Sequence, residues 1–188
     1  MSTRTTKNKS AAFYFFTITC FRWLHLFEIT NFYEEIFTWF ELLKNYKTHI
    51  VAYVIMPNHL HVVVYFDNDC TSINKVISNG KRFMAYEIVK RLSDMKKENL
   101  LYFLEKNVNE RERLTGKIHQ VFEPSFDLKE LFSEKFIFQK IQYLHLNPVR
   151  KKWRLCDTFL DYKYSSARFY EGLFYSGYPV SHYLDFIK

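Results

Sequence analysis

The sequence feature that most constrains the fold is an apolar, β-branched run over residues 52–65 that Pro57 and Asn58 interrupt once. β-Branched residues favour strands, and a proline cannot donate a hydrogen bond inside a sheet. We therefore expect one strand over residues 49–56 and another over residues 59–66. The tight turn between them favours a hairpin, and a bend within one long edge strand is the alternative.

Two histidines, His59 and His61, stand at the start of the second predicted strand. Because alternate residues of a strand point to the same side, both imidazoles are expected on one face and Leu60 on the other. Two imidazoles on a rigid strand can bind one divalent metal ion, provided that the fold supplies a third ligand and leaves positions open for substrate. The alternative is a pair of histidines with a purely structural role.

The rest of the chain predicts strands and long helices. The patterns indicate two further strands, residues 13–20 and 117–126, and three helices, residues 31–46, 72–92 and 130–146. Thr30 or Asn31 is the expected cap of the first helix. The charged stretch 93–117 is interpreted as a helical insertion or a mobile loop. The predicted fold class is α+β, a central antiparallel sheet with helices packed on it, in a single domain over residues 11–188 that follows a flexible basic arm over residues 1–10.

The composition suits an anionic partner. The 188 residues carry 27 Lys and Arg against 20 Asp and Glu, a net charge of +7. Such a domain suits a phosphate backbone, and a basic surface that only aids solubility is the alternative. The three cysteines are too far apart for a zinc site, so we expect reduced thiols in a cytoplasmic protein. No stretch is apolar enough over a sufficient length to predict a membrane span, and no signal peptide is expected.

The end of the last predicted helix carries a second group of polar side chains. Tyr143 and Asn147 are four residues apart, so they can address one point in space. Lys140 shares their flank, about a quarter-turn from the expected buried stripe of Ile137, Ile141 and Leu144. A cationic cluster suited to phosphates follows, made of Arg150, Lys151 and Lys152. The alternatives are a tyrosine at the edge of the core and an asparagine that merely ends a helix before Pro148.

Three segments, in order along the chain, resemble the HUH single-tyrosine transposases, where U is a bulky apolar residue. They are residues 56–64 (Met-Pro-Asn-His-Leu-His-Val-Val-Val), residues 143–150 (Tyr-Leu-His-Leu-Asn-Pro-Val-Arg) and residues 161–170 (Asp-Tyr-Lys-Tyr-Ser-Ser-Ala-Arg-Phe-Tyr). The chain is most similar to the REP-associated tyrosine transposases, relatives of the insertion-sequence-200 type. A weaker match covers residues 122–127, which lack the Trp and Arg common in that segment. The stretch 93–117 is longer and more charged than the usual connection.

The resemblance implies a ferredoxin-like HUH fold and a specific chemistry. It implies that His59 and His61 bind a divalent metal ion, Mg²⁺ or Mn²⁺, and that Tyr143 is the nucleophile. Asn147 matches the position of a third, polar ligand. The enzyme would cleave single-stranded or hairpin DNA through a 5′-phosphotyrosine and rejoin strands without a nucleotide cofactor. Relatives include monomers and dimers, so a monomer or homodimer is expected.

Several cations are predicted to contact the DNA. They are Arg4, Lys7 and Lys9 in the basic arm, Lys140 beside the tyrosine, the cluster Arg150, Lys151 and Lys152, and Lys163 and Arg168 near the C-terminus. Nearby aromatic side chains either stack on bases or pack in the core, namely Tyr162, Tyr164 and Phe169. Two other functions are kept as alternatives. One is a hairpin-binding module that does not cut, and the other is a metal-dependent nuclease that uses water.

Overall fold

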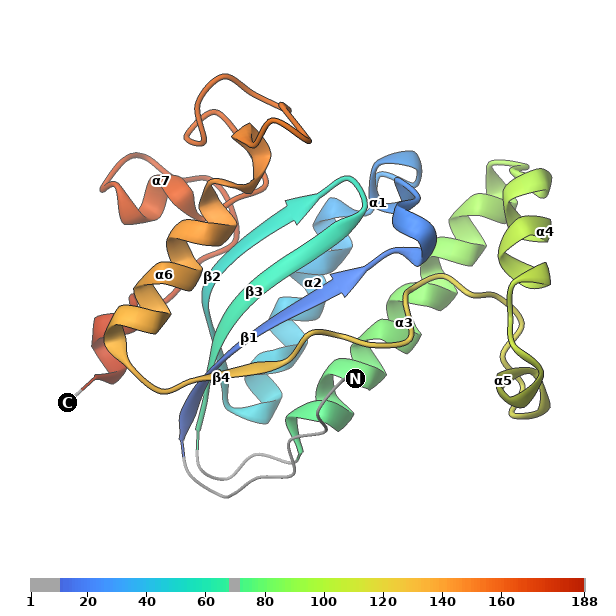
Figure 1. The fold of residues 1–188 in the computed structure, drawn as a ribbon, viewed down its shortest axis with the longest axis horizontal. Coiled ribbons are helices and arrows are strands. Elements are labelled where there is room, and N and C mark those ends of the chain that lie inside the picture. The colour runs from blue at the N-terminus through green and yellow to red at the C-terminus, as the bar shows by residue number, and fades with distance from the viewer. Residues whose placement is uncertain (1–10, 68–71, 188) are drawn as a thin grey trace.

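The computed structural model describes residues 11–67 and 72–187. Its centre is a four-stranded antiparallel sheet in the order β2-β3-β1-β4 (Figure 1). The strands are β1 (Ala12–Thr19), β2 (Thr48–Met56), β3 (His59–Phe66) and β4 (Lys129–Leu131). This arrangement confirms the predicted α+β class.

β2 and β3 form the predicted hairpin around Pro57 and Asn58, with Met56 opposite His59. β1 lies along the other side of β3, where it places Thr19 opposite His59 and Thr17 opposite His61. β3 is therefore a central strand, hydrogen-bonded on both sides, and the start of this strand is fixed by two neighbours.

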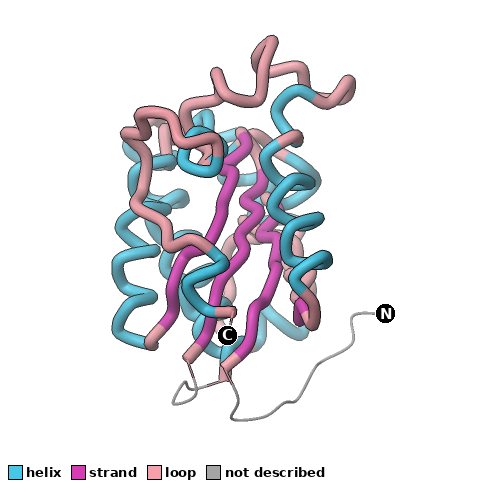
Figure 2. The backbone as a smooth tube through the Cα atoms, turned by 90° about the vertical axis from the view of Figure 1, so that its left-hand side faces the viewer, coloured by secondary structure: helices cyan, strands magenta, loops and turns pink. Residues whose placement is uncertain are grey.

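Helices cover both faces of the sheet, with α2 and α3 on one face and α6 on the other (Figures 1 and 2). The helices are α1 (Leu26–Ile29), α2 (Tyr33–Leu43), α3 (Ile73–Asp94), α4 (Glu98–Lys106), α5 (Glu110–Leu114), α6 (Glu134–His145) and α7 (Ala167–Tyr170). Short 3-10 turns span Phe21–Trp23, Lys44–Tyr46, Asn147–Val149 and Tyr183–Phe186. Within the described residues, none of the helices has the length and apolar character required to cross a bilayer.

The alternation of β3 divides its side chains between two cores. Leu60 and Val62 pack with α2 and α3, whereas Val63 packs with the apolar stripe of α6. His59 and His61 have the same parity as Val63 and lie on the α6 face. The expectation that both histidines share one face is confirmed.

The predicted strand over residues 117–126 is wrong. That segment makes only an isolated bridge between Cys20 and Phe122, and the fourth strand is β4 instead. β4 takes the first residues of the predicted helix 130–146, which begins only at Glu134. The Ser133 hydroxyl accepts a hydrogen bond from the backbone N–H of Phe136, so it caps α6 at that point.

The predicted cap of the helix over residues 31–46, which is α2 in the structure, is also wrong. Thr30 donates its hydroxyl proton back to the Leu26 carbonyl at 2.6 Å, so it ends α1 rather than starting α2. Asn31 adopts a left-handed conformation with φ of 46°, and α2 begins after Phe32 without a side-chain cap. The short helix α1 was not visible in the hydrophobic pattern, because four residues carry too little periodicity.

The charged stretch 93–117 forms two helices, α4 and α5. Asn109 caps α5 by accepting a hydrogen bond from the Glu112 N–H at 2.8 Å. In Figure 1 these two helices lie beyond α3 as seen from the sheet. Leu104 of α4 is fully buried, so this stretch is anchored to the rest of the domain by apolar packing.

The segment 161–170, part of the family resemblance, covers the edge of β2. The Ile55 N–H donates to the Tyr164 carbonyl at 2.8 Å, and the Ser166 N–H donates to the Tyr53 carbonyl at 3.0 Å. Tyr164 also stacks on Tyr33 with ring centroids 3.8 Å apart, and the Tyr162 hydroxyl donates to the Ile55 carbonyl. These two tyrosines therefore pack in the fold, the second of the two roles expected for them.

Gly80 in the middle of α3 permits a close approach of α2. The ring of Trp39 packs on it, and a Cβ at this position would lie 2.7 Å or less from three ring atoms. We expect Gly80→Ala to lower the free energy of unfolding by up to about 2 kcal/mol, because overpacking costs about 1–3 kcal/mol and the gain in helix propensity returns about 1 kcal/mol. Urea unfolding measures this difference. Ser78→Ala, at an exposed position of the same helix, serves as control and should stay within about 0.5 kcal/mol of wild type.

Candidate active site

His59 and His61 lie side by side, with ring centroids 4.7 Å apart, and both are almost fully buried. The Nδ1 atom of His59 lies 2.7 Å from Asn58 Oδ1. The Asn58 amide nitrogen donates to the Trp23 carbonyl at 2.9 Å, which determines the orientation of the amide. Because an amide oxygen only accepts, His59 carries its proton on Nδ1, and its Nε2 retains the lone pair.

His61 is held in a similar way from β1. Its Nδ1 atom lies 2.7 Å from the Thr17 hydroxyl oxygen, and its ring stacks on Phe15 at 5.4 Å. In both histidines Nδ1 is therefore engaged by a neighbour and Nε2 is the nitrogen left for a ligand. Metal-binding histidines typically have one ring nitrogen oriented by such a partner.

Both imidazoles are neutral at neutral pH. Burial, together with the nearby cation of Lys152, lowers the pKa of His59 to about 3. Burial and the positive charge that His59, Arg150 and Lys140 can carry hold the pKa of His61 well below its ordinary value. Neutral imidazole is the form that binds a metal ion.

Tyr143 stands beside this pair on α6. Its half-buried ring lies 5.4 Å from the His61 ring and 6.1 Å from Phe15. The guanidinium of Arg150 lies 4.3 Å from the ring centroid and the Lys140 ammonium 5.3 Å. The predicted buried stripe is confirmed, because Ile137, Ile141 and Leu144 are buried.

The end of α6 turns the cationic cluster toward the site. The helix ends at His145 and continues as a 3-10 turn at Asn147, whose carbonyl accepts from the Arg150 N–H at 3.2 Å. The Trp153 N–H donates to the Arg150 carbonyl at 2.8 Å. Asn147 is buried one turn beyond Tyr143, and its role as a third metal ligand stays a prediction.

The predicted DNA-contacting cations divide into three groups. Lys140, Arg150 and Lys152 converge on the two histidines, and Lys151 is exposed next to them. The Lys163 ammonium lies over the Tyr164 ring, and Arg168 donates to the Phe174 carbonyl at 2.7 Å, which ties down a C-terminal loop. DNA contacts by these two residues stay predictions. Arg4, Lys7 and Lys9 lie outside the described residues.

Two tryptophans that the sequence did not point to complete the site. Trp23 and Trp153 lie 5.3 and 5.2 Å from the His59 ring, and 5.9 Å from each other. The Lys152 ammonium lies 4.5 and 4.7 Å from the two indole rings. No sequence signal could have found Trp23, because it comes from the connection after β1, far in sequence from every predicted site residue.

His145, which lies inside the matched segment 143–150, has a structural role. Its Nε2 atom lies 2.9 Å from the Ser166 hydroxyl oxygen, and burial lowers its pKa to about 3. Ser166 also accepts from the Tyr53 N–H at 3.0 Å, so this contact fastens α6 to the edge of β2. Burial and pKa alone therefore do not separate this histidine from His59.

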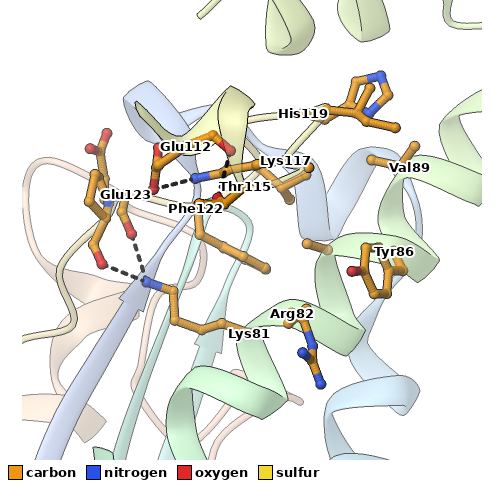
Figure 3. A pocket seen from close by; sticks show the side chains of 15 residues that line it. Lys81, Arg82, Tyr86, Val89, Glu112, Thr115, Lys117, His119, Phe122 and Glu123 are labelled. Carbon is orange, nitrogen blue, oxygen red and sulfur yellow. Dashed lines mark hydrogen bonds and ion pairs between the residues drawn. The ribbon is translucent and has the colours of Figure 1, made fainter. Parts of the chain in front are cut away.

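A separate cavity lies between α3, α5 and residues 115–124 (Figure 3). Its volume is about 510 Å³. In its lining Lys81 donates to the carbonyls of Glu123 and Pro124 at 2.7 and 3.3 Å, and Lys117 pairs with Glu112 at 3.0 Å. Since the Lys81 cation is bound to backbone, it fastens residues 123–124 to α3.

Lys81 gives a clear pH dependence of stability. Burial lowers its pKa to about 8, below the 10.5 of a lysine in water. The unfolded chain therefore binds this proton more tightly, and the cost of burying the charge disappears as the pH rises from 8 to 10.5. We expect the free energy of unfolding of wild type, relative to that of Lys81→Met, to rise by about 1–3 kcal/mol across that range. Urea unfolding at the two ends of the range measures it, and parallel pH profiles would contradict the assignment.

Two comparisons with known proteins concern part of the chain and its fold. Residues 19–104 match the family model described as "Transposase IS200 like". The matched span includes the histidine pair, covers less than half of the chain, and ends before Tyr143. No curated protein sequence matches the chain.

Among solved structures, the REP-associated tyrosine transposase bound to a REP hairpin has a TM-score of 0.58 and 16% sequence identity. The match covers 93% of this chain and 88% of that chain. A putative transposase from Deinococcus radiodurans R1 matches 76% of this chain and 95% of that chain at 14% identity. Its TM-score of 0.38 is too low to indicate a shared fold. The first match shows a shared fold, so the predicted resemblance is confirmed for the fold and for the IS200-like segment.

Proposed function

We propose that this chain, which carries an IS200-like transposase segment on the fold of a REP-associated tyrosine transposase, cleaves and rejoins DNA strands by tyrosine catalysis. The substrate is single-stranded or hairpin DNA, and the intermediate is a 5′-phosphotyrosine at Tyr143. The observation that carries the proposal is the position of this tyrosine. Its ring lies 5.4 Å from His61 and 4.3 Å from the Arg150 guanidinium.

The donor atoms of the site fit a divalent metal ion. His59 and His61 would hold it through Nε2, and Asn147 is the proposed third ligand. Within residues 11–67 and 72–187, no cluster of three or more His, Cys, Asp or Glu side chains is placed to hold a metal ion. No carboxylate or thiolate of these residues therefore joins the two histidines, and the proposed donors are mostly imidazole. This set suits Mn²⁺ better than Mg²⁺. When bound, the ion would polarise a phosphate oxygen of the DNA.

The charges of the site favour an anionic substrate. The side chains that shift the two histidines electrostatically are all basic, namely Lys152 at His59, and His59, Arg150 and Lys140 at His61. A divalent cation in such surroundings is poorly compensated by the protein. A phosphodiester would supply the missing negative charge, so metal and DNA are expected to favour each other's binding.

In the proposed reaction the Tyr143 hydroxyl oxygen attacks the scissile phosphorus. The bond from phosphorus to the tyrosine oxygen forms as the hydroxyl gives up its proton, and the bond from phosphorus to the 3′ oxygen breaks. That oxygen takes up one proton and leaves as a 3′-hydroxyl, so the step involves no net gain or loss of protons. Lys140 and Arg150 flank the tyrosine ring and would stabilise negative charge on its oxygen and on the phosphate. Attack by another 3′-hydroxyl reverses the step and joins two strands, because the phosphotyrosine keeps the energy of the phosphodiester.

The proposal is tested by looking for the covalent intermediate. Wild-type protein is incubated with Mn²⁺ and labelled hairpin oligonucleotides that are taken from repeats beside the gene, and the products are separated on a denaturing gel. We expect a protein–DNA adduct that requires the metal and is absent with a plain duplex. Mass spectrometry of the digested adduct should find the nucleotide on the peptide that contains Tyr143.

Two other outcomes would replace the proposal. Tight hairpin binding without any adduct would indicate a binding module that does not cut. Strand cleavage without an adduct, unchanged when Tyr143 is replaced, would indicate a nuclease that activates water.

A further inference from the structure

We propose that Trp23, Trp153 and Lys152 form a stacking platform for an unpaired base of the DNA strand beside the reaction centre. This inference rests on the proposed function for its substrate class and assigns it a binding site. An indole face offers a stacking surface to any base, and stacking on aromatic side chains is how proteins hold single strands without reading sequence. We call these three residues the tryptophan platform.

The position of the platform fits a base next to the scissile phosphate. Both indole rings lie within 5.3 Å of the His59 ring, centroid to centroid. Lys152 lies over both rings and also acts electrostatically on His59, so the same cation can reach a phosphate at the histidine pair. An aromatic surface with a cation above it, next to a phosphate site, matches a nucleotide with its base and its phosphate.

Trp23 stays partly exposed although its ring contacts His59, Trp153 and Lys152. This side chain is 47% exposed, whereas Trp39, the third tryptophan, is 6% exposed and packs in the core. The exposed half of the Trp23 side chain is apolar surface in contact with water, which a stacked base would cover.

The backbone that presents Trp23 is strained and firmly held. Arg22 and Trp23 both adopt left-handed conformations, with φ of 50° and 59°. Such conformations cost free energy in non-glycine residues and persist where the surroundings over-determine them.

Three hydrogen bonds hold this turn in place. The Arg22 N–H donates to the Glu123 carboxylate at 2.8 Å, the Trp23 N–H donates to the Cys20 carbonyl at 3.0 Å, and the Asn58 amide donates to the Trp23 carbonyl at 2.9 Å. Glu123 is in turn fastened to α3 by Lys81, as Figure 3 shows. The turn is therefore clamped so that the indole lies over His59.

The platform is tested by comparing strands with and without bases. The probes are a fluorescent oligothymidylate strand and an abasic strand of the same length, which keeps the phosphates and lacks the bases. Wild type should bind oligothymidylate about tenfold more tightly than the abasic strand, since stacking contributes that much per base. Trp23→Ala and Trp153→Ala should lose most of this preference while binding the abasic strand as wild type does. Trp23→Phe should recover part of it.

Matched variants separate stacking from charge. Tyr102→Ala removes another exposed aromatic ring with a cation over it, Lys106 at 4.8 Å, from α4, and should bind both strands as wild type does. Arg150→Ala should weaken binding of both strands by the same factor. A wild-type protein without preference for the base-bearing strand, or tryptophan variants that weaken both strands equally, would overturn the platform.

A second measurement needs no substitution. Wild-type tryptophan fluorescence should be quenched by oligothymidylate and not by the abasic strand, and equal spectra with both strands would overturn the platform. Neither assay requires cleavage. A protein that stacks bases but forms no adduct would refute the proposed function alone, whereas a Trp23→Ala variant with wild-type strand preference and wild-type adduct yield would refute the platform alone.

Discussion

Tyr143→Phe is expected to abolish the covalent adduct, a loss of at least about a thousandfold, because the substitution removes the only atom proposed to bond to phosphorus. Phenylalanine keeps the ring that contacts His61, Phe15 and the two flanking cations, so the fold and the binding of hairpin DNA should be retained. The measurement is adduct yield on a denaturing gel beside hairpin affinity from fluorescence anisotropy.

Tyr65→Phe is the matched control for this substitution. Tyr65 lies on β3, on the same face as the histidine pair, and stacks on Phe186 at 4.2 Å, away from Tyr143. This variant should form the adduct as wild type does. An adduct that persists in Tyr143→Phe would refute the assignment of the nucleophile.

Replacing both His59 and His61 by alanine is expected to eliminate Mn²⁺ binding and to reduce the adduct by at least about a hundredfold. The expectation follows from the loss of both imidazole ligands, since even the loss of an outer partner typically costs about 10–100-fold in metal affinity or activity. Titration of Mn²⁺ followed by electron paramagnetic resonance measures the first effect, and the adduct assay measures the second. Circular dichroism and thermal unfolding report whether the double variant is folded.

His145→Ala is the control for the loss of a buried histidine that does not belong to the site. This histidine is as buried as His59 and is equally neutral, yet it contacts Ser166 rather than the site. Its loss should lower stability by about 1–3 kcal/mol, because it leaves the Ser166 hydroxyl without this partner. At a temperature where the variant is folded, the Mn²⁺ affinity of His145→Ala should equal that of wild type.

Unchanged Mn²⁺ binding in the variant that lacks both His59 and His61 would refute the metal site.

Periodic patterns predicted the parts of the fold that depend on residues close together in the sequence. The hairpin was predicted from the β-branched residues and from Pro57, which has no backbone N–H to donate within a sheet. The apolar stripe of α6 was predicted from helical spacing. Elements that depend on distant partners were missed. β4 is only three residues long and exists because β1 offers it an edge, and α1 is a single turn, so neither has a period of its own.

The candidate site shows the same division. His59 and His61 share a face because they are two residues apart on one strand, and this spacing can be read directly from the sequence. The orientation of His61 by Thr17, by contrast, needs the register of β1 against β3, and that of Trp23 needs a clamped left-handed turn. These contacts join residues that the chain keeps far apart, so no local spacing encodes them.

The sequence by itself determined which residue types are present and which of them share a strand face or a helix flank, because strand and helix periods are properties of the local backbone. The tertiary structure decided that the flank with Tyr143 meets the face with the histidines, since the packing of α6 on one side of the sheet is a choice between two faces. It also decided which cations converge on the site, and it brought Trp23 and Trp153 over His59. Burial of apolar surface drives that packing, and burial depends on the whole chain rather than on any one segment of it.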